Sequence, residues 1–190
     1  MRSTSDDICH IEGGIDLTRK IEVVPHNPRW AAMFQTEADQ LATVFGSAAL
    51  AIEHIGSSAI PGIKAKPIID ILVVVEDIER VDNFNEQMMT LGYEPRGEFG
   101  IPGRRYFSTG HSDADRPRHV HVFQSGNPQV ARHIDFRDYL RAHPDDAQAY
   151  SRLKETLAKK FPNDAESYTN GKSDFIREID RKAAAWKADA

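Results

Sequence analysis

The sequence lacks the residues that several common kinds of site require. It contains one cysteine, Cys9, so an intramolecular disulfide is impossible and a cysteine-rich zinc site is excluded. No apolar run reaches the length that crosses a bilayer, and no glycine-rich loop has the spacing of a Walker-type or dinucleotide-binding motif. We therefore expect a cytoplasmic protein that spans no membrane and is neither a P-loop kinase nor a dehydrogenase.

An excess of positive charge is also absent. The formal net charge is −5 and the sequence pI is about 5.9, so we do not expect nucleic acid as a partner. With 190 residues, 40% of them hydrophobic, the chain is large enough for one domain with an ordinary core.

The order of patterns along the chain predicts an α/β fold with a mixed sheet. We expect a loose leader at residues 1–16, a mixed α/β core at residues 17–126, and C-terminal helices at residues 127–190 packed on that core as one structural unit. Helices are expected from Asn27-Pro28 to Gly46, from Ile78 to Leu91, from 127 to about 142, from 145 to 160 and from about 163 to 186. Strands are expected on both sides of a central loop and at 93–99, 104–108 and 118–123.

Small and basic residues gather in that central loop, between two apolar runs of the stretch from Ala51 to Val75. The loop holds Gly56, Ser57, Ser58, Gly62, Lys64 and Lys66. These residues lie where two strand ends should meet, so backbone amides and ammonium groups are expected there together. The pattern predicts a phosphate site.

The same stretch resembles the signature of the nucleotidyltransferase superfamily. Ile55-Gly56-Ser57 is followed, after residues 58–69, by the apolar strand that Asp70 opens. The resemblance implies that the Gly-Ser turn approaches a triphosphate and that carboxylates hold divalent metal ions. One departure is Leu72, which stands where metal-dependent members carry a second carboxylate. This residue places nucleotidyl transfer by two metal ions in doubt.

Several separated motifs resemble the GrpB family, a group of nucleotidyltransferase-like proteins, over the chain from about Ile21 to Trp186. They are His54 to Gly62, Lys66 to Val73, His119 to Phe123, Phe136 to Arg141, and Tyr168 to Ile176. The resemblance implies a nucleotidyltransferase-like core with a C-terminal helical part. It also implies that Leu72 is a family trait, and some relatives are joined to dephospho-coenzyme A kinase.

Histidines supply an independent signal. His119 and His121 are two residues apart on an expected strand, so both imidazoles should face the same side. With Asp70 and His54 they could hold one divalent metal ion, Mg²⁺, Mn²⁺ or Zn²⁺, and His133 could join from the following helix. The alternative is that both imidazoles are ordinary hydrogen-bonded residues on a half-exposed strand.

Basic residues are the other signal. Five arginines surround the expected strands after the central unit: Arg96, Arg104, Arg105, Arg116 and Arg118. Arg105 is favoured because it lies within a strand, although interleaved acidic residues could neutralise the whole group. In the helical part, Arg137, Arg141, Lys154 and Lys172 could line a cleft against the sheet. Gly171, beside Lys172, predicts a helix break or a close approach, and the alternative for these cations is an ordinary helix surface.

These patterns lead to a hypothesis with an open alternative. The chain is expected to bind a nucleotide or another phosphorylated small molecule and, if it is an enzyme, to transfer a nucleotidyl group or hydrolyse a phosphorylated substrate with a divalent metal. The expected catalytic residues are Asp70, His119 and His121, and the expected metal ligands are these three and His54. The expected phosphate-binding residues are Gly56, Ser57, Ser58, Lys66, Arg105, Arg137, Lys154 and Lys172. The alternative is a non-catalytic binding or regulatory module that has lost the second carboxylate at Leu72.

Overall fold

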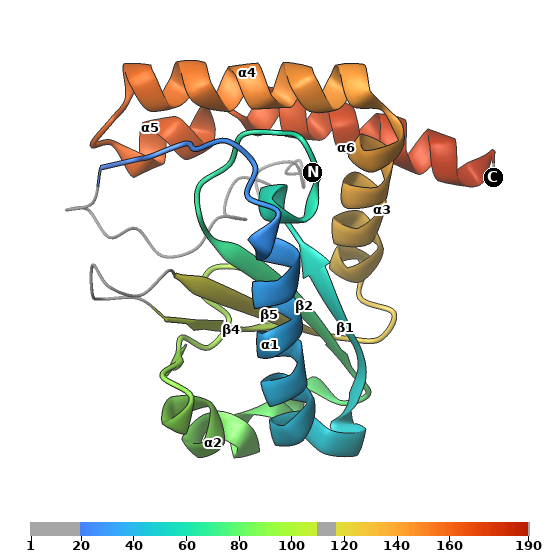
Figure 1. The fold of residues 1–190 in the computed structure, drawn as a ribbon. Helices are drawn as coiled ribbons and strands as arrows, with labels where there is room; N and C mark the ends of the chain where they lie inside the picture. The colour runs from blue at the N-terminus through green and yellow to red at the C-terminus, as the bar shows by residue number, and fades with distance from the viewer. Residues whose placement is uncertain (1–19, 110–116, 190) are drawn as a thin grey trace, which may run out of the picture.

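A mixed sheet of five strands forms the centre of the computed structural model, which describes residues 20–109 and 117–189 (Figure 1). The strands are β1 (Ala49–Ile55), β2 (Ile69–Val75), β3 (Glu94–Pro95), β4 (Arg104–Ser108) and β5 (Arg118–Gln124), in the spatial order β1-β2-β5-β4-β3. Strands β2 and β5 are parallel, and the other neighbouring pairs are antiparallel. The expected α/β fold with a mixed sheet is therefore confirmed. The leader expected at residues 1–16 lies outside the described residues.

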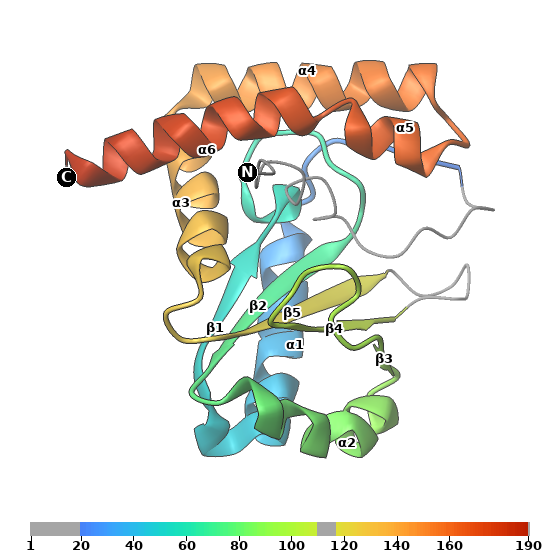
Figure 2. The same ribbon diagram turned by 180° about the vertical axis from the view of Figure 1, so that it is seen from behind.

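One face of the sheet is covered by α1 (Arg29–Phe45), which lies in front of the strands in Figure 1 and behind them in Figure 2. Because strand side chains alternate between faces, Ile71, Val73 and Val120 all point toward this helix and join Trp30 in the largest apolar core. We call this side the α1 face. The helix begins after Asn27, whose side chain accepts from the Arg29 amide at 3.0 Å, so the predicted start is confirmed.

The opposite side, which we call the α3 face, carries the alternate residues of the same strands. Leu72, Val74 and Phe123 pack there against Val130 and Ile134 of α3 (Pro128–Ala142). Apolar residues on both faces explain why β2 reads as a nearly continuous hydrophobic run.

Three further helices, α4 (Pro144–Lys160), α5 (Ala165–Asn170) and α6 (Ser173–Ala188), lie across one end of the sheet (Figures 1 and 2). They pack on the loop between β1 and β2, because Ile60 and Ile63 of that loop belong to an apolar cluster with Leu140, Tyr150 and Ile179. Hydrogen bonds reinforce this contact. From the end of α3, the Arg141 guanidinium also donates to the Ala59 carbonyl at 2.8 and 3.0 Å, and the Lys64 amide donates to Ser151 Oγ of α4 at 2.8 Å. The helices therefore fix the shape of the loop.

The prediction of a single α-helix over residues 78–91 was wrong. The structure has a 3₁₀ helix, η4 (Ile78–Phe84), followed by the short helix α2 (Asn85–Thr90). In a 3₁₀ helix every third side chain lies on one line, and Ile78, Val81 and Phe84 follow that spacing toward the core. A spacing of three suits both kinds of helix over so short a stretch, so the pattern did not distinguish them.

Two other elements are shorter than expected. The strand expected over 93–99 is limited to Glu94–Pro95, because the chain turns away at Phe99, whose φ is 44°. The last helix is divided into α5 and α6 at Gly171. A Cβ at Gly171 would lie 2.5 Å from Cδ2 of Leu157, so the expected break and the expected close approach both occur. Within the described part of the chain, no helix combines the length and the apolar character needed to cross a bilayer.

Candidate functional site

The turn after β1 brings the backbone against Asp70. Gly56 has φ +70° and ψ −172°, a conformation that glycine adopts without strain. Ile55 and Asp70 are paired across β1 and β2, and a Cβ on Gly56 would lie 2.5 Å from Asp70 Oδ2. A glycine at this position therefore gives the carboxylate its space, which the sequence motif alone does not explain.

Both imidazoles of β5 lie on the α3 face beside this carboxylate, as the spacing of two predicted. Asp70 is paired with His119 in the parallel register, and His119 Nδ1 lies 3.1 Å from Asp70 Oδ1. His121 Nε2 lies 4.0 Å from the same oxygen. The geometry thus brings Ser57, Asp70, His119 and His121 to one side of the sheet. Their expected catalytic roles stay predictions.

A buried arginine supports the imidazole of His121. Arg104 is 0% exposed, and its Nη1 lies 3.2 Å from His121 Nδ1. It also donates to the carbonyls of Glu98 at 3.2 Å and Phe99 at 2.7 Å, and its guanidinium lies 4.8 Å from the centre of the Tyr106 ring. Burial lowers the pKa of Arg104 to about 10, which still leaves the group charged at neutral pH.

Sequence analysis did not select Arg104. It ranked Arg105 first, although a strand turns neighbouring side chains to opposite faces. The register between β4 and β5 pairs Tyr106 with His121, so Arg104, two residues away, shares the α3 face with the imidazoles. That parity was the available signal, but it could be used only once the pairing of the strands was known.

Ammonium groups and an aromatic ring surround a hollow next to the Gly-Ser turn. We call it the lysine hollow. Ser57, Ser58, Lys66, Asp70, Lys154 and Tyr168 line it. Lys154 is 1% exposed, and its Nζ lies 4.4 Å from the centre of the Tyr150 ring. Lys172 is 0% exposed, and its Nζ lies 4.3 Å from the centre of the Tyr168 ring. Lysines from the loop, α4 and the α5–α6 junction therefore meet at one place.

A second hollow adjoins the first and shares Ser57 and Asp70 with it. We call it the aromatic hollow. Its walls include Ile55, His121, His133, Phe136, Tyr150 and Ile176. Tyr150 meets Phe136 edge-on at 5.8 Å and is stacked on Phe175 at 5.3 Å. Asp70 thus lies between a cationic hollow and a largely apolar one.

His133, on α3, is a titratable group of the aromatic hollow, whose walls also include Arg132 and Tyr150. Its ring centre lies 5.6 Å from that of His121, and its Nε2 is buried without a hydrogen-bond partner among the described residues. Burial, followed by the charges of Arg132 and Arg104, lowers the pKa of His133 to about 3, so the imidazole is neutral at pH 7. The hollow therefore offers an uncharged polar atom that a ligand can satisfy.

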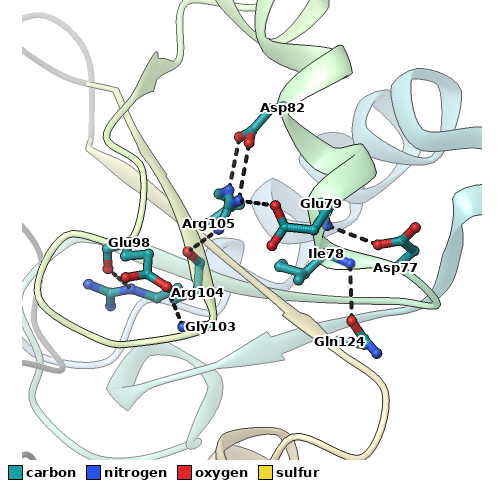
Figure 3. A network of polar contacts seen from close by, with 9 residues as sticks. All are labelled: Asp77, Ile78, Glu79, Asp82, Glu98, Gly103, Arg104, Arg105 and Gln124. Carbon is teal, nitrogen blue, oxygen red and sulfur yellow. Dashed lines mark hydrogen bonds and ion pairs between the residues drawn. The ribbon is translucent and has the colours of Figure 1, made fainter.

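His119 and Lys172 line neither hollow, but each contacts a lining residue, Asp70 and Tyr168 respectively. Three other expected site residues lie away from both hollows. Arg105 points to the α1 face, where it pairs with Asp82 at 2.9 Å and Glu79 at 3.3 Å (Figure 3). Arg137 joins Glu53 at 2.8 Å and the His54 carbonyl at 3.0 Å, which ties α3 to β1. The His54 ring also lies on the α1 face.

His54 is held there by two neighbours. Its ring is stacked on Phe34 with 4.8 Å between the centres, and its Nε2 lies 3.1 Å from Ser58 Oγ. Burial lowers the pKa of His54 to about 4, although the nearby charge of Asp70 opposes the shift. His54 therefore contacts the Gly-Ser turn from the α1 face and does not face the hollows.

The side chains around Asp70 do not fit the divalent metal ion that the sequence analysis expects. Asp70 is a single carboxylate, because Leu72 occupies the second acidic position and is fully buried. An ionised carboxylate can only accept, so the contact of 3.1 Å between His119 Nδ1 and Asp70 Oδ1 requires a proton on Nδ1, whereas a metal ligand must present a lone pair. Among the described residues, no group of three or more His, Cys, Asp or Glu side chains is arranged to hold a metal ion.

Comparison with known proteins places the chain among a set of sequence relatives. The family model described as "GrpB protein" matches residues 20–182. UPF0157 protein YqkA of Bacillus subtilis is 47% identical over 169 residues, which are 89% of this chain and 49% of that protein. The chain thus spans about half the length of this relative.

Solved structures agree with this result at the level of the fold. The crystal structure of the conserved protein GrpB from Enterococcus faecalis has a TM-score of 0.81 and 42% identity, and the match covers 85% of this chain and 96% of that one. The Cid1 poly(U) polymerase bound to MgATP has a TM-score of 0.50 and 11% identity over 72% of this chain and 44% of that one. The second likeness shows that the fold is nucleotidyltransferase-like, and it carries nothing about activity.

Proposed function

We propose that this chain, which belongs to the GrpB family, binds a phosphorylated small molecule with its phosphate in the lysine hollow. The observation that carries the proposal is the convergence of Lys66, Lys154 and Lys172 on the space around Tyr168. Lys66 Nζ and Lys172 Nζ lie 5.6 and 4.3 Å from the centre of that ring, and Lys154 lines the hollow. These residues come from distant parts of the chain, so the gathering of charge results from the fold.

Electrostatics favour an anion at this place. Three ammonium groups and one carboxylate, that of Asp70, lie in or next to the lysine hollow, which leaves an excess of positive charge in a chain of net charge −5. Two of the lysines are almost completely buried, and at low dielectric a charge acts on a neighbouring phosphate more strongly than in water. The hydroxyls of Ser57 and Ser58 can donate hydrogen bonds to the same oxygens.

The aromatic hollow suits the organic part of the same ligand. It shares Ser57 and Asp70 with the lysine hollow, so one molecule can occupy both. Its walls are mainly apolar and aromatic, with the neutral imidazole of His133 as a hydrogen-bonding group. A nucleotide and a coenzyme A precursor both combine phosphate with such an organic part.

Binding without transfer is the form of this function that the side chains favour, because they do not fit the metal pair used by nucleotidyl-transferring enzymes. Transfer or hydrolysis is the second candidate. Asp70 favours it, because this carboxylate lies at the boundary of both hollows and can accept a proton from a group bound beside the phosphate.

Isothermal titration calorimetry tests the binding step. Inorganic pyrophosphate, nucleoside triphosphates and coenzyme A precursors are titrated into the wild type, Lys154→Gln, Lys66→Gln and the control Lys159→Gln. Lys159 lies on the same helix as Lys154, but its side chain is 76% exposed. We expect at least tenfold weaker binding in the first two variants and wild-type binding in the control. No binding of any phosphate compound, or equal losses in all three variants, would contradict the proposal.

A turnover assay separates the two forms of the function. Any ligand that binds is incubated with the wild type and Asp70→Asn, and its phosphorus atoms are followed by ³¹P NMR. Binding without conversion supports the binding module, whereas conversion that Asp70→Asn abolishes supports transfer or hydrolysis.

A further inference from the structure

We propose that Asp70 works without a divalent cation, so that the site takes its phosphorylated ligand as the metal-free anion. Two imidazole N–H groups, from His119 and His121, are directed toward the Asp70 carboxylate in place of a metal ion. This inference deepens the proposed function and rests on it for the identity of the ligand.

The first step of the argument is the protonation of His121. A guanidinium can only donate hydrogen bonds, and Arg104 Nη1 lies 3.2 Å from His121 Nδ1, so Nδ1 must be the acceptor. A neutral imidazole then carries its proton on Nε2. This N–H faces Asp70 Oδ1 at 4.0 Å, which leaves His121 no lone pair on the side of the carboxylate.

The second step concerns His119. A carboxylate can only accept, and His119 Nδ1 lies 3.1 Å from Asp70 Oδ1, so Nδ1 carries the proton. Both imidazoles therefore present N–H groups to the same oxygen. A cation that used those nitrogens as ligands would have to displace both protons.

The third step is that this arrangement is held firmly. For Nε2 of His121 to lose its proton, Nδ1 would have to gain one and Arg104 would have to withdraw. Arg104 is completely buried and donates to the carbonyls of Glu98 and Phe99, so withdrawal would break these bonds and leave a buried guanidinium without acceptors.

Two parts of the site therefore have different roles: the imidazoles position Asp70, and the lysines bind the phosphate. The N–H group of His119 holds Asp70 through Oδ1, and the N–H group of His121 lies 4.0 Å from the same oxygen. Oδ2 lies against Gly56, and Asp70 lines both hollows. Oδ2 can then accept a hydrogen bond from a hydroxyl or an amine of the ligand. The negative charge of the phosphate is balanced by the ammonium groups of Lys66, Lys154 and Lys172. The ligand class is thus a free phosphate or diphosphate ester with a hydrogen-bond donor near the phosphate.

Mn²⁺ titration followed by ¹⁵N–¹H NMR tests the inference without any ligand. A Mn²⁺ ion at Asp70 would selectively broaden the amide signals of Gly56 and Ile71, and we expect no selective broadening up to millimolar Mn²⁺. His119→Asp is the positive control, because it puts a second carboxylate in register with Asp70 and should gain such broadening. Selective broadening in the wild type at submillimolar Mn²⁺ would overturn the inference.

Two further measurements complete the test. The imidazole ¹⁵N shifts of His121 should report a proton on Nε2, and a proton on Nδ1 would overturn the argument from Arg104. Calorimetry with pyrophosphate should give the same or tighter binding in EDTA as in Mg²⁺, and a tenfold gain with Mg²⁺ would also overturn it. If neither pyrophosphate nor any other phosphate compound binds in either buffer, the proposed function fails, and the Mn²⁺ result still decides whether Asp70 holds a metal.

Discussion

Arg104 and His121 form a buried pair in which a guanidinium nitrogen lies 3.2 Å from an imidazole nitrogen. The neighbouring Arg105 has the same chemistry but points to the other face, where its partners Asp82 and Glu79 are 51% and 78% exposed (Figure 3). Two adjacent arginines therefore have opposite environments, and this contrast provides a matched experiment.

Replacing Arg104 by Met should destabilise the protein far more than replacing Arg105 by Met. The first change removes a buried guanidinium that donates to His121 Nδ1 and to two backbone carbonyls, which should cost about 2–4 kcal/mol of unfolding free energy. The second removes ion pairs with solvent-exposed partners, worth at most about 1 kcal/mol. Urea denaturation of both variants measures the difference, and equal losses would show that Arg104 has no special role.

Gly56→Ala should weaken ligand binding, whereas Gly62→Ala should not. Both glycines have positive φ, 70° and 80°, so either change costs about 1–2 kcal/mol of stability through backbone strain. Only at Gly56 would the new Cβ approach Asp70 Oδ2 at 2.5 Å, since nothing lies within 4 Å of the position at Gly62. Calorimetry with pyrophosphate should show at least a tenfold loss for Gly56→Ala alone. A similar loss in both variants would mean that backbone strain, and not the position of Asp70, controls binding.

His133→Phe should weaken binding in the aromatic hollow and leave binding in the lysine hollow unchanged. The imidazole Nε2 is buried without a hydrogen-bond partner among the residues that the structure describes, so removal of the nitrogen should leave stability unchanged or slightly higher. A nucleotide or coenzyme A precursor that uses this nitrogen should bind several-fold more weakly, while inorganic pyrophosphate should bind as it does to the wild type. An equal effect on both ligands would contradict the assignment of the organic part to the aromatic hollow.

Stability should fall as the pH drops from about 6.5 toward 4, and His54 should cause part of the loss. Its pKa is lowered by burial to about 4, while an unfolded chain binds the same proton near 6.5. Above pH 6.5 His54 is neutral in both the folded and the unfolded state, so it does not reduce the free energy of unfolding. Below pH 6.5 the unfolded state binds the proton before the folded state does, and the free energy of unfolding falls. The loss from one such group is on the order of 1 kcal/mol per pH unit in this interval.

The variant His54→Gln isolates this contribution. It keeps a hydrogen-bonding group near Ser58 Oγ but cannot titrate. Urea denaturation at pH 7, 6 and 5 should show a shallower decline for the variant than for the wild type. Parallel curves would show that His54 does not control this pH range.

The sequence predicted the parts of the site that depend on local periodicity. The spacing of two between His119 and His121 sufficed to put both imidazoles on one face, and the glycine at 171 correctly marked both a helix break and a close approach. Parity within one strand is a local property, so a single sequence contains it.

The parts that failed depend on how strands pair. Whether Arg104 or Arg105 faces the imidazoles is decided by the register of β4 on β5, and a shift of one residue would exchange them. His54 lies on the α1 face for the same reason, because its pairing with Ile71 sets its direction. Nothing in the sequence marked Tyr150, and Tyr168 appeared only as the first residue of a family motif, since aromatic residues on helices serve as core far more often than as walls of a site.

The lysine hollow is built from Lys66 near the start of β2, Lys154 on α4 and Tyr168 on α5. No early folding intermediate that contains only the sheet can possess it, because two of its walls come from the last third of the chain. A chain can therefore bind the ligand only after nearly all of the described residues have been synthesised and folded. By mass action, the same ligand would protect the finished protein from unfolding and degradation while leaving unfinished chains unprotected.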